Sequence, residues 1–274
     1  MLHELGAHCY RACLDCTHQF LDLESLNIHT EQIFDDHYFS GGGDGYPDYL
    51  GDRDLLLSRG LRYARRVARH TGKNIGELLD IGSAAGFIAR GFQTLGWSPH
   101  GLEPNLSMAA HATIKENVPT TLGTIESFHT DQLFDLVSMI QVIGHLPDPA
   151  ATLAKVRRLL KSGGLLLVET WDCRSLAARL LGSRWHEYNP SSVLQVFSRR
   201  SLGMLAERTG FRTITCKRTT KSLRAAHAKA VIDHKYQGGR LHRYALSPAL
   251  KLIPDNANIP YPSDDLFWTI LEAI

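Results

Sequence analysis

The stretch from Glu77 to Ala89 reads ELLDIGSAAGFIA and constrains the fold more than any other segment. Its apolar first half is typical of a buried parallel strand, and Gly82 and Gly86 bracket a turn where backbone comes close to a ligand. A helix beginning at Phe87 would direct its N-terminal N–H groups at the same point. Asp80 adds a carboxylate, which repels a phosphate and attracts a cation or a donor-rich ligand. The stretch therefore predicts a ligand-facing turn after a central strand.

Strands and helices alternate along the rest of the chain. The expected helices cover about 53–71, 87–92, 150–160 and 198–210, and the expected strands cover 100–103, 134–140, 165–169, 211–216 and 264–271. A further strand end is expected at 123–128. We interpret the arginines of the first helix as a solvated face. Alternating elements joined by short glycine turns predict an α/β fold with a mostly parallel sheet.

The composition fits a globular chain in a reducing compartment. The 274 residues can bury a large core, and 43% hydrophobic with 21% charged residues is ordinary for such a chain. Five cysteines at irregular spacing and no secretory signal argue against a disulfide framework. The longest apolar runs are too short to span a membrane. We therefore expect a cytoplasmic protein without a transmembrane segment.

The N-terminal cysteines could belong to a metal site or be free thiols. Cys13 and Cys16 form half of a zinc-ribbon pattern, but the chain has no second such pair. Cys9 with His8 or His18 could complete only a cramped site. We favour a truncated ribbon with free thiols and predict no metal.

A glycine-rich loop and a basic stretch lie on either side of this core. Residues 41–45 are mostly glycine, and aromatic neighbours such as Tyr46 could cap an adenosyl-type ligand or pin the loop to the body. Residues 217–251 hold nine Lys and Arg against one acid, with helical apolar spacing from Leu223 to Ile232. We favour a solvated helical insertion there over a site for an acidic substrate, and rank nucleic acid third because no recognition motif accompanies the charge.

The spacing of acids and glycines separates three nucleotide-binding motifs. The NAD fingerprint needs a different glycine spacing, and a Walker loop needs a Lys that is absent here. The remaining form, Asp80-x-Gly82-x-x-x-Gly86, resembles motif I of the class I S-adenosylmethionine-dependent methyltransferases. The resemblance continues at residues 102–104, 123–126, 134–149, 159–169 and 265–271. Glu103 follows Asp80 by one β-α-β step, where an acid commonly accepts both ribose hydroxyls.

The resemblance covers about residues 36–271 and implies S-adenosylmethionine as the cofactor. It implies a Rossmann-like, seven-stranded, mostly parallel sheet with an antiparallel last strand, an N-terminal extension and a helical lid insertion. The extension would span 1–50 and the methyltransferase domain 51–274, with 171–195 and 217–251 as substrate-side or lid insertions. The implied cofactor-binding residues are Tyr46, Asp80, Gly82, Ser83, Ala84, Gly86, Phe87, Glu103, Pro104, Thr124, Ile125 and Gln141.

Within this set, Glu103 would hold the ribose, and Asp80 the methionyl ammonium through water or backbone. Thr124 and Ile125 would flank adenine, although Ile125 could equally be core. Gln141 would lie beside the methionyl group.

The acceptor is expected to be a small molecule, methylated on a hydroxyl oxygen by in-line displacement. The subgroup that the chain resembles consists mostly of enzymes of secondary-metabolite, quinone or saccharide pathways. His145 follows the fourth strand and could be the general base, or could pack its loop. His186 and Asp172 are the reserve candidates. Trp171, Trp185 and Tyr188 could wall the acceptor or form lid core.

Three departures from the family pattern keep a second hypothesis open. Ala84 stands where a middle glycine is usual, Gly144 replaces a glutamate, and Val193 replaces a histidine common in the subgroup. These changes would suit a non-catalytic S-adenosylmethionine-binding protein that acts as a partner or regulator. An NAD-dependent oxidoreductase is a third, poorer reading. The sequence points to no nucleic-acid partner and leaves the oligomeric state open, a homodimer included.

Overall fold

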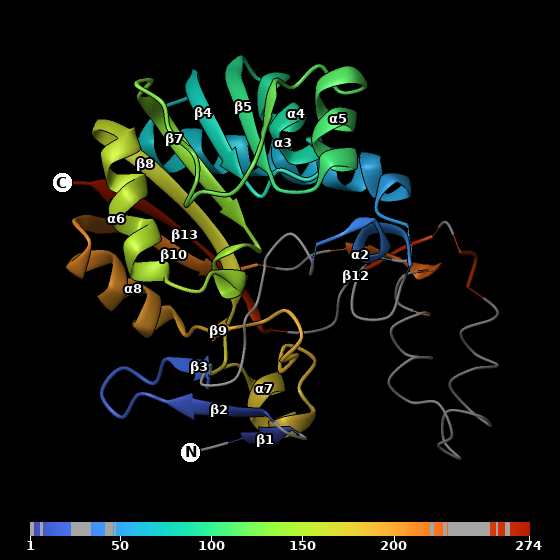
Figure 1. The fold of residues 1–274 in the computed structure, drawn as a ribbon, viewed down its shortest axis with the longest axis vertical. Helices are drawn as coiled ribbons and strands as arrows, with labels where there is room; N and C mark the ends of the chain where they lie inside the picture. The colour runs from blue at the N-terminus through green and yellow to red at the C-terminus, as the bar shows by residue number, and fades with distance from the viewer. Residues whose placement is uncertain are drawn as a thin grey trace.

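A seven-stranded sheet organises the molecule. The computed structural model describes residues 3–5, 8–22, 34–41, 46, 48–219, 222–226, 229, 253–255, 257–260 and 264–274. The sheet has the order β10-β13-β8-β7-β4-β5-β6, and β13 runs antiparallel to both of its neighbours. The other pairings in this sheet are parallel. The structure confirms the predicted seven-stranded, mostly parallel sheet with an antiparallel last strand (Figure 1).

The described elements have the following bounds. The strands of the large sheet are β4 (Gly76–Ile81), β5 (Trp97–Glu103), β6 (Thr120–Leu122), β7 (Phe134–Ile140), β8 (Leu160–Trp171), β10 (Phe211–Arg218) and β13 (Leu266–Ala273). The remaining strands are β1 (His3–Leu5), β2 (His8–Ala12), β3 (Gln19–Leu21), β9 (Gln195–Val196), β11 (Ser222–Arg224) and β12 (Asn258–Pro260). The α-helices are α2 (Asp36–Ser40), α3 (Arg53–Thr71), α4 (Phe87–Gln93), α5 (Leu106–Ile114), α6 (Pro149–Leu159), α7 (Leu176–Leu181) and α8 (Arg199–Arg208). Short 3-10 turns occupy Leu50–Asp52, Ile143–His145 and Gly182–Arg184.

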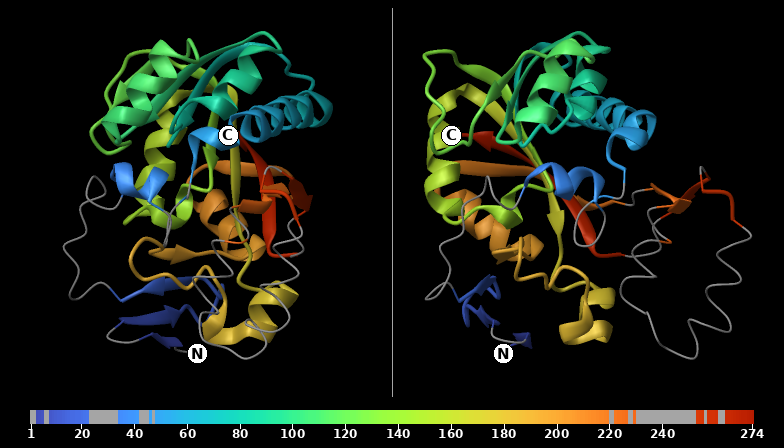
Figure 2. Two further views of the ribbon diagram at one scale, coloured as in Figure 1. Left: turned by 90° about the vertical axis from the view of Figure 1, so that its right-hand side faces the viewer. Right: turned by 45° about the vertical axis from the view of Figure 1, so that its right-hand side comes forward.

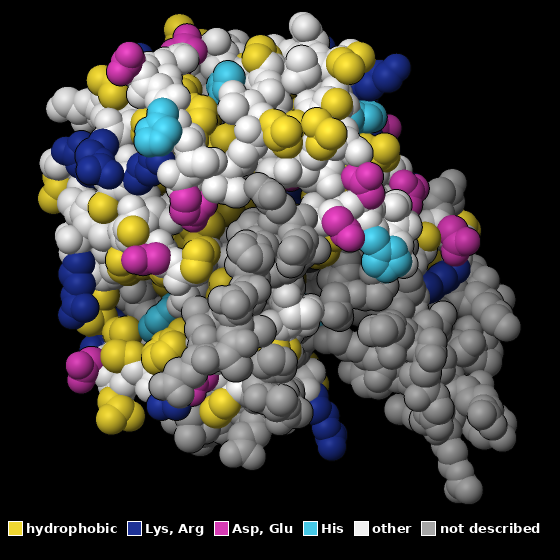
Figure 3. Space-filling model, in the orientation of Figure 1, with side chains coloured by type: hydrophobic (Ala, Val, Ile, Leu, Met, Phe, Trp, Pro, Cys, Tyr) yellow, Lys and Arg dark blue, Asp and Glu magenta, His cyan; other side chains and the backbone are white. Residues whose placement is uncertain are grey.

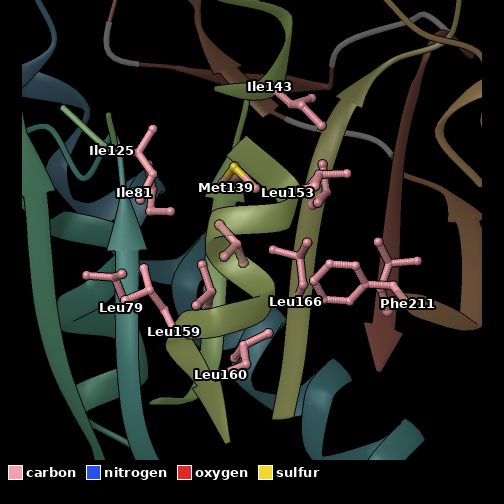
Figure 4. Close-up of a cluster of buried hydrophobic side chains, with 14 of the residues drawn as sticks. Leu79, Ile81, Ile125, Met139, Ile143, Leu153, Leu159, Leu160, Leu166 and Phe211 are labelled. Carbon is pink, nitrogen blue, oxygen red and sulfur yellow. The ribbon is translucent and has the colours of Figure 1, made fainter. Parts of the chain in front are cut away.

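Both faces of the sheet are covered by helices, which explains the continuous apolar runs of the strands. Leu166 and Val168 of β8 pack toward α6 and α8, whereas Leu165 and Leu167 pack toward α3 and α4. Figure 4 shows the first of these clusters, with Leu153 of α6 beside the strand residues. Alternate side chains of each strand therefore belong to different halves of the core.

Four local predictions needed correction. Arg59 lies on the predicted solvated face of α3 but is only 8% exposed. β5 begins at Trp97, three residues before the expected strand at 100–103. The indole of Trp97 packs in the core against Phe92 of α4, which draws these residues into the sheet. β6 ends at Leu122, so residues 123–128 form the turn after the strand. β8 begins at Leu160 and runs through Gly163, so the glycines lie inside a strand.

A smaller sheet joins the N-terminus to the chain that follows β8. It has the order β1-β2-β3-β9 and is antiparallel throughout. Tyr10 and Leu21 of this sheet share a buried cluster with Trp185, and the Tyr10 hydroxyl donates to the Val193 carbonyl at 2.5 Å. Figure 2 shows the hairpin and α7 on the same side of the large sheet. The predicted boundary at residue 50 stays a prediction.

Two predicted segments fall largely outside the described residues. The glycine run 42–45 lies outside them, as does most of 217–251. In the segment 217–251 we expected a lid helix to begin near Leu223. The structure instead has the strand β11 there, which pairs with β12. Arg224 of β11 donates to Asp52 at 2.8 Å, so this strand is tied to the start of α3. On the face drawn in Figure 3, basic and acidic side chains of the described residues are interspersed. No described helix is long and apolar enough to cross a bilayer.

Candidate functional site

The turn after β4 adopts the backbone that its small residues allow. Gly82 and Gly86 have φ of 68° and 77°, in the left-handed region that glycine enters without steric cost. A Cβ on Gly82 would lie 2.5 Å from Cγ2 of Val142, so this position requires glycine. Ala84 also has a positive φ of 46°, at the position where the family usually has glycine. Alanine therefore keeps the turn at some conformational cost.

Asp80 is the last buried acid before this turn. Its carboxyl is 3% exposed and accepts a hydrogen bond from Ser138 Oγ at 2.6 Å. The pKa of Asp80 is raised to about 7, chiefly by burial; the Ser138 bond acts to lower it and the nearby charge of Glu103 to raise it. A group with this pKa becomes a stable carboxylate when a cation binds beside it.

Glu103 ends β5 on the neighbouring strand and points back at the turn. Its carboxylate accepts from the backbone N–H of Ala84 at 2.8 Å and of Asn105 at 2.9 Å. Burial raises the pKa of Glu103 to about 7 despite these two bonds. Its own carbonyl accepts from the N–H of Gly123, which brings the turn after β6 beside it. The structure thus brings together the acid pair and the turn that bears Thr124.

Two further predicted residues carry buried polar atoms without a protein partner. Ser83 Oγ and Gln141 Nε2 are buried and make no hydrogen bond within the described part of the chain. Gln141 has a φ of 61°, and its N–H donates to the Glu169 carbonyl at 2.8 Å. Buried donors normally have partners, so these atoms suit a polar ligand. Together with the acid pair, they fit the ribose and ammonium groups of an adenosyl amino acid.

Some of the other predicted cofactor residues lie near the turn after β4, and one lies in the core. Phe87 is fully buried and stacks on Tyr49 at 5.8 Å between ring centroids. Ile125 belongs to the large core cluster, in line with the second of its two readings. Tyr46 is half-buried with its ring 4.9 Å from that of Tyr49. Pro104 follows Glu103 directly and precedes Asn105, which caps α5.

Sequence reasoning missed a buried ion pair beside these residues. Arg59 of α3 forms an ion pair with Glu169 near the end of β8, and both side chains are almost fully buried. Burial lowers the pKa of Arg59 to about 10, while the nearby hydroxyls of Tyr46 and Tyr49 act to raise it. The sequence did carry one indication of this burial. Arg59 shares a face of α3 with the apolar Leu56 and the aromatic Tyr63.

The chain from Phe34 to Tyr49 covers the turn. Here we call its described residues, 34–41, 46, 48 and 49, the strap. Phe39 and Tyr49 pack in one buried cluster with Ala84, Ala85 and Phe87, while Asn105 Nδ2 donates to the Phe34 carbonyl at 3.1 Å. Figures 1 and 2 show α2 of the strap next to the carboxyl ends of the strands. The strap therefore separates the glycine turn from solvent.

His145 lies in the loop after β7, and its orientation is fixed. Its Nδ1–H donates to the Ser192 carbonyl at 2.8 Å, so Nε2 is the basic nitrogen of the neutral ring. Burial lowers the pKa of His145, against the Ser192 and Gln141 carbonyls and the Glu187 charge, which raise it. The ring of Phe34 meets it edge-on at 5.2 Å. The bond to Ser192 and the contact with Phe34 thus hold the half-buried His145 ring in one orientation.

A narrow hollow lies at His145. It is lined by residues of β8, of β9 and of the loops that follow β7 and precede or follow β9, namely Gln141, Gly144, His145, Thr170, Trp171, Glu187, Val193, Gln195, Val196 and Phe197. Of the candidates for substrate contact, Trp171 lines it and Trp185 does not. A larger hollow of about 380 Å³ lies along β5 and β6 but holds neither Asp80, Glu103 nor His145. The narrower hollow therefore holds His145 and Glu187, whereas Asp80 and Glu103 line neither hollow.

The two reserve candidates have other contacts. The Asp172 carboxylate accepts hydrogen bonds from Arg199 Nε at 3.2 Å and from the Arg174 N–H at 2.9 Å. It therefore stabilises the turn after β8. His186 contacts Trp171 edge-on at 4.8 Å and pairs with Glu187 at 3.2 Å. Glu187, which the sequence reading did not select, reaches the hollow, whereas neither reserve candidate lines it. In the described ranges, no group of three or more His, Cys, Asp or Glu could hold a metal ion.

These features define a known class of protein. A family model described as "Methyltransferase domain" matches residues 51–215, more than half of the chain. The chain therefore belongs to the methyltransferase domain family, as the motif resemblance predicted.

Solved structures agree on the fold. An S-adenosylmethionine-dependent methyltransferase from Mesorhizobium loti has a TM-score of 0.50 at 16% identity, covering 77% of this chain and 96% of that chain. The magnesium protoporphyrin IX methyltransferase of Synechocystis PCC 6803, solved with bound S-adenosylhomocysteine, has a TM-score of 0.51 at 10% identity, covering 82% and 85%. The [4+2]-cyclase SpnF has a TM-score of 0.52 at 18% identity, covering 78% and 81%.

Among curated proteins, the similarity is to ubiquinone biosynthesis O-methyltransferases. The protein from Bradyrhizobium sp. strain ORS 278 is 30% identical over 115 residues, which cover 39% of this chain and 46% of the relative. The protein from Rhodopseudomonas palustris strain HaA2 is 30% identical over 140 residues, covering 48% and 54%. The chain thus spans about half the length of the curated relatives it matches.

Proposed function

We propose that this protein is an S-adenosylmethionine-dependent methyltransferase that acts on a hydroxyl oxygen of a small molecule. The observation that carries the proposal is the pair of buried acids, Asp80 and Glu103, held against the turn from Gly82 to Gly86. Both carboxyls have a pKa of about 7, because burial disfavours their charged forms. A cationic, hydroxyl-rich ligand stabilises two such groups, whereas a dinucleotide diphosphate would be repelled by them.

Residues of the turn and its neighbours would bind the cofactor. The Glu103 carboxylate would accept hydrogen bonds from the two ribose hydroxyls, and the Asp80 carboxylate would attract the methionyl ammonium. We assign Arg59 to the methionyl carboxylate, which would share this buried guanidinium with Glu169 beside Tyr46 and Tyr49. Bound S-adenosylmethionine supplies an electrophilic methyl group. The aromatic side chains of the strap exclude water from it.

His145 would remove the proton of the acceptor hydroxyl. Its Nδ1–H is held by the Ser192 carbonyl, so Nε2 takes the proton. The resulting imidazolium is stabilised by the charge of Glu187 and by the Gln141 carbonyl, both of which raise the pKa of the ring. Trp171 and Phe197 offer apolar walls for a planar or aliphatic acceptor, and Gln195 an amide for its orientation. The curated O-methyltransferase relatives support oxygen as the methylated atom.

A second candidate function is cofactor binding without methyl transfer. The [4+2]-cyclase of the same fold illustrates that this architecture also serves other reactions. Ala84, Gly144 and Val193 support this reading, since each departs from the family pattern. Val193 lines the hollow, where a histidine is common in the subgroup.

Calorimetry and a turnover assay would test the proposal. Wild-type protein should bind S-adenosylmethionine and S-adenosylhomocysteine, and Glu103→Gln should bind both more weakly. Glu126→Gln, at an exposed position after β6, is the matched control and should bind like wild type. Absence of binding to wild type would reject both candidates. Tight binding with no methyl transfer to a panel of phenols, catechols and sugars would favour the second. A cytoplasmic location and a small-molecule acceptor are parts of the same proposal.

A further inference from the structure

The tip of the N-terminal hairpin brings two thiols together outside the candidate site. Cys13 and Cys16 lie in the turn between β2 and β3, which the backbone closes by Cys13 N–H to His18 carbonyl at 2.8 Å and Thr17 N–H to Cys13 carbonyl at 3.1 Å. This tight turn places the two cysteines three residues apart in one hairpin loop. In Figure 1 this turn is the outer end of the blue hairpin.

The turn is open to reagents in solution. Leu14 at its tip is 92% exposed, and the thiols on either side are partly exposed. Hydrogen bonds from the backbone N–H groups of Cys16 and Asp15 and from the Cys16 thiol lower the pKa of Cys13, which increases its thiolate fraction at neutral pH. Cys173 and Cys216 behave in the opposite way. Burial raises the pKa of Cys173 to about 12 and also raises the pKa of Cys216.

We propose that Cys13 and Cys16 form a redox-active dithiol that an external disulfide, such as oxidised glutathione, converts into an intramolecular disulfide. The Cys13 thiolate attacks one sulfur of the oxidant, whose S–S bond breaks and releases one glutathione thiolate. Cys16 then loses its proton, attacks Cys13 Sγ and releases the second glutathione. Two electrons pass from the dithiol to the oxidant, and its two thiols take up two protons.

A metal site is the competing use of such a pair. A tetrahedral zinc site needs four ligands, and two thiols supply half of them. Among the residues that the structure describes, no third His, Cys, Asp or Glu completes a metal-binding group with them. The pair therefore favours two-electron thiol chemistry over metal binding.

The turn is connected to the acceptor side of the site. Thr17 Oγ1 lies 3.4 Å from Ser198 Oγ at the start of α8, and the Thr17 carbonyl accepts from Cys173 Sγ at 3.9 Å. His18 Nε2 lies 2.8 Å from Gln195 Oε1, and Gln195 Nε2 donates to the Pro147 carbonyl at 3.3 Å. Gln195 lines the hollow at His145. Disulfide formation should therefore change the acceptor side and leave the cofactor turn unchanged.

The test uses the full chain with oxidised glutathione and intact-protein mass spectrometry. Wild type and Cys9→Ser, a matched control in the same hairpin, should each lose two hydrogens and show a Cys13–Cys16 disulfide peptide. Cys16→Ser should stop as a glutathione adduct on Cys13, and Cys13→Ser should form no intramolecular disulfide. At pH 7, iodoacetamide should modify Cys13 faster than Cys9. Hydrogen exchange should change on oxidation at residues 193–198 and not at 80–86.

Three results would overturn the proposal. The first is that excess oxidant forms no Cys13–Cys16 bond. The second is equal alkylation rates for Cys9 and Cys13. The third is stoichiometric zinc in the purified protein that Cys13→Ser releases, which would make the pair a metal ligand. A normal melting temperature of each serine variant would exclude misfolding as the cause of a negative result.

Discussion

The proposed cofactor side and the proposed acceptor side of this site are built on different principles. The cofactor side consists of consecutive residues at the ends of two adjacent parallel strands, Asp80 to Gly86 and Glu103 to Asn105. The acceptor side gathers His145, Glu187 and Gln195 from three separate loops and strands. Side chains that follow adjacent strands are fixed by the sheet register, whereas those from separate loops depend on long-range packing.

This difference suggests that the two sides can be altered independently. Mutations on the acceptor side should change turnover without changing cofactor affinity, and mutations of the acid pair should do the reverse. Coupled effects would show that the two sides form one unit.

The largest expected effect is on turnover. Replacing His145 with alanine should lower kcat by about 10²- to 10⁴-fold, because it removes the proposed general base. The Kd for S-adenosylmethionine should stay within about twofold of wild type, since cofactor binding does not depend on His145. Steady-state kinetics with an identified acceptor, and calorimetry, measure the two quantities.

The pH dependence of turnover sharpens this assignment. Burial lowers the pKa of His145 below 6.5, so its neutral, proton-accepting form prevails at pH 7 and is lost on acidification. Wild-type kcat should therefore fall as the pH drops through a midpoint below 6.5. His100→Ala is the control, because burial also lowers the pKa of His100 but its Nε2 lies 2.8 Å from Thr121 Oγ1 on β6, remote from the hollow. An unchanged kcat for His145→Ala would reject the base assignment.

The second effect is on cofactor affinity. Glu103→Gln should weaken S-adenosylmethionine binding by roughly 10- to 100-fold, the range for losing hydrogen bonds to a charged group. The N–H groups of Ala84 and Asn105 donate to different oxygens of Glu103, so the amide NH₂ of glutamine also removes one of these two acceptors. Turnover at saturating cofactor should change much less. A kcat loss as large as that of His145→Ala would contradict the separation of the two sides.

The third effect concerns stability without cofactor. Burial raises the pKa of Asp80 from 3.8 to about 7, so between these values the folded chain binds more protons than the unfolded chain. The free energy of unfolding therefore falls as pH rises from about 4 to 7. Asp80→Asn should remove part of this decline, by roughly 1–2 kcal/mol at pH 7 relative to pH 5. Urea titrations at both pH values measure it, and Asp131→Asn, an exposed control, should keep the wild-type slope.

The smallest effect should come from the strap. Phe34→Leu keeps an apolar side chain but removes the ring edge that packs 5.2 Å from His145. We expect kcat to fall by about two- to fivefold, because the base loses part of its support. Phe20→Leu, on the exposed face of β3, is the control. A loss of cofactor binding in Phe34→Leu would instead assign the strap to the cofactor side.

Prediction from sequence succeeded where neighbouring residues determine the structure. The bounds of α3 and β7 follow from local periodicity, and Gly72 ends α3 in a left-handed conformation, with φ of 76°. Asp80 and Glu103 meet because they end adjacent strands, which the spacing already implied.

Prediction failed where contacts between segments distant in the sequence determine the structure. Arg59 is buried because Glu169, 110 residues later, receives it, and no local pattern indicates this partner. Glu187 lines the hollow and Asp172 forms an ion pair with Arg199. Both contacts likewise depend on packing between segments that are distant in the sequence. The four-stranded sheet joins residues about 175 positions apart along the chain, so neither the hairpin nor β9 alone predicts it.

One contact limits how far the two sides can evolve apart. A side chain at Gly82 would meet Val142, the first residue of the segment that leads to His145. The side chains allowed in the glycine turn and at the start of the acceptor loop therefore depend on each other. Grafting the acceptor loop of a relative onto this scaffold should succeed only when position 142 carries a side chain no larger than valine. New acceptors are reached most easily by changes after residue 142, where the cofactor turn imposes no restriction.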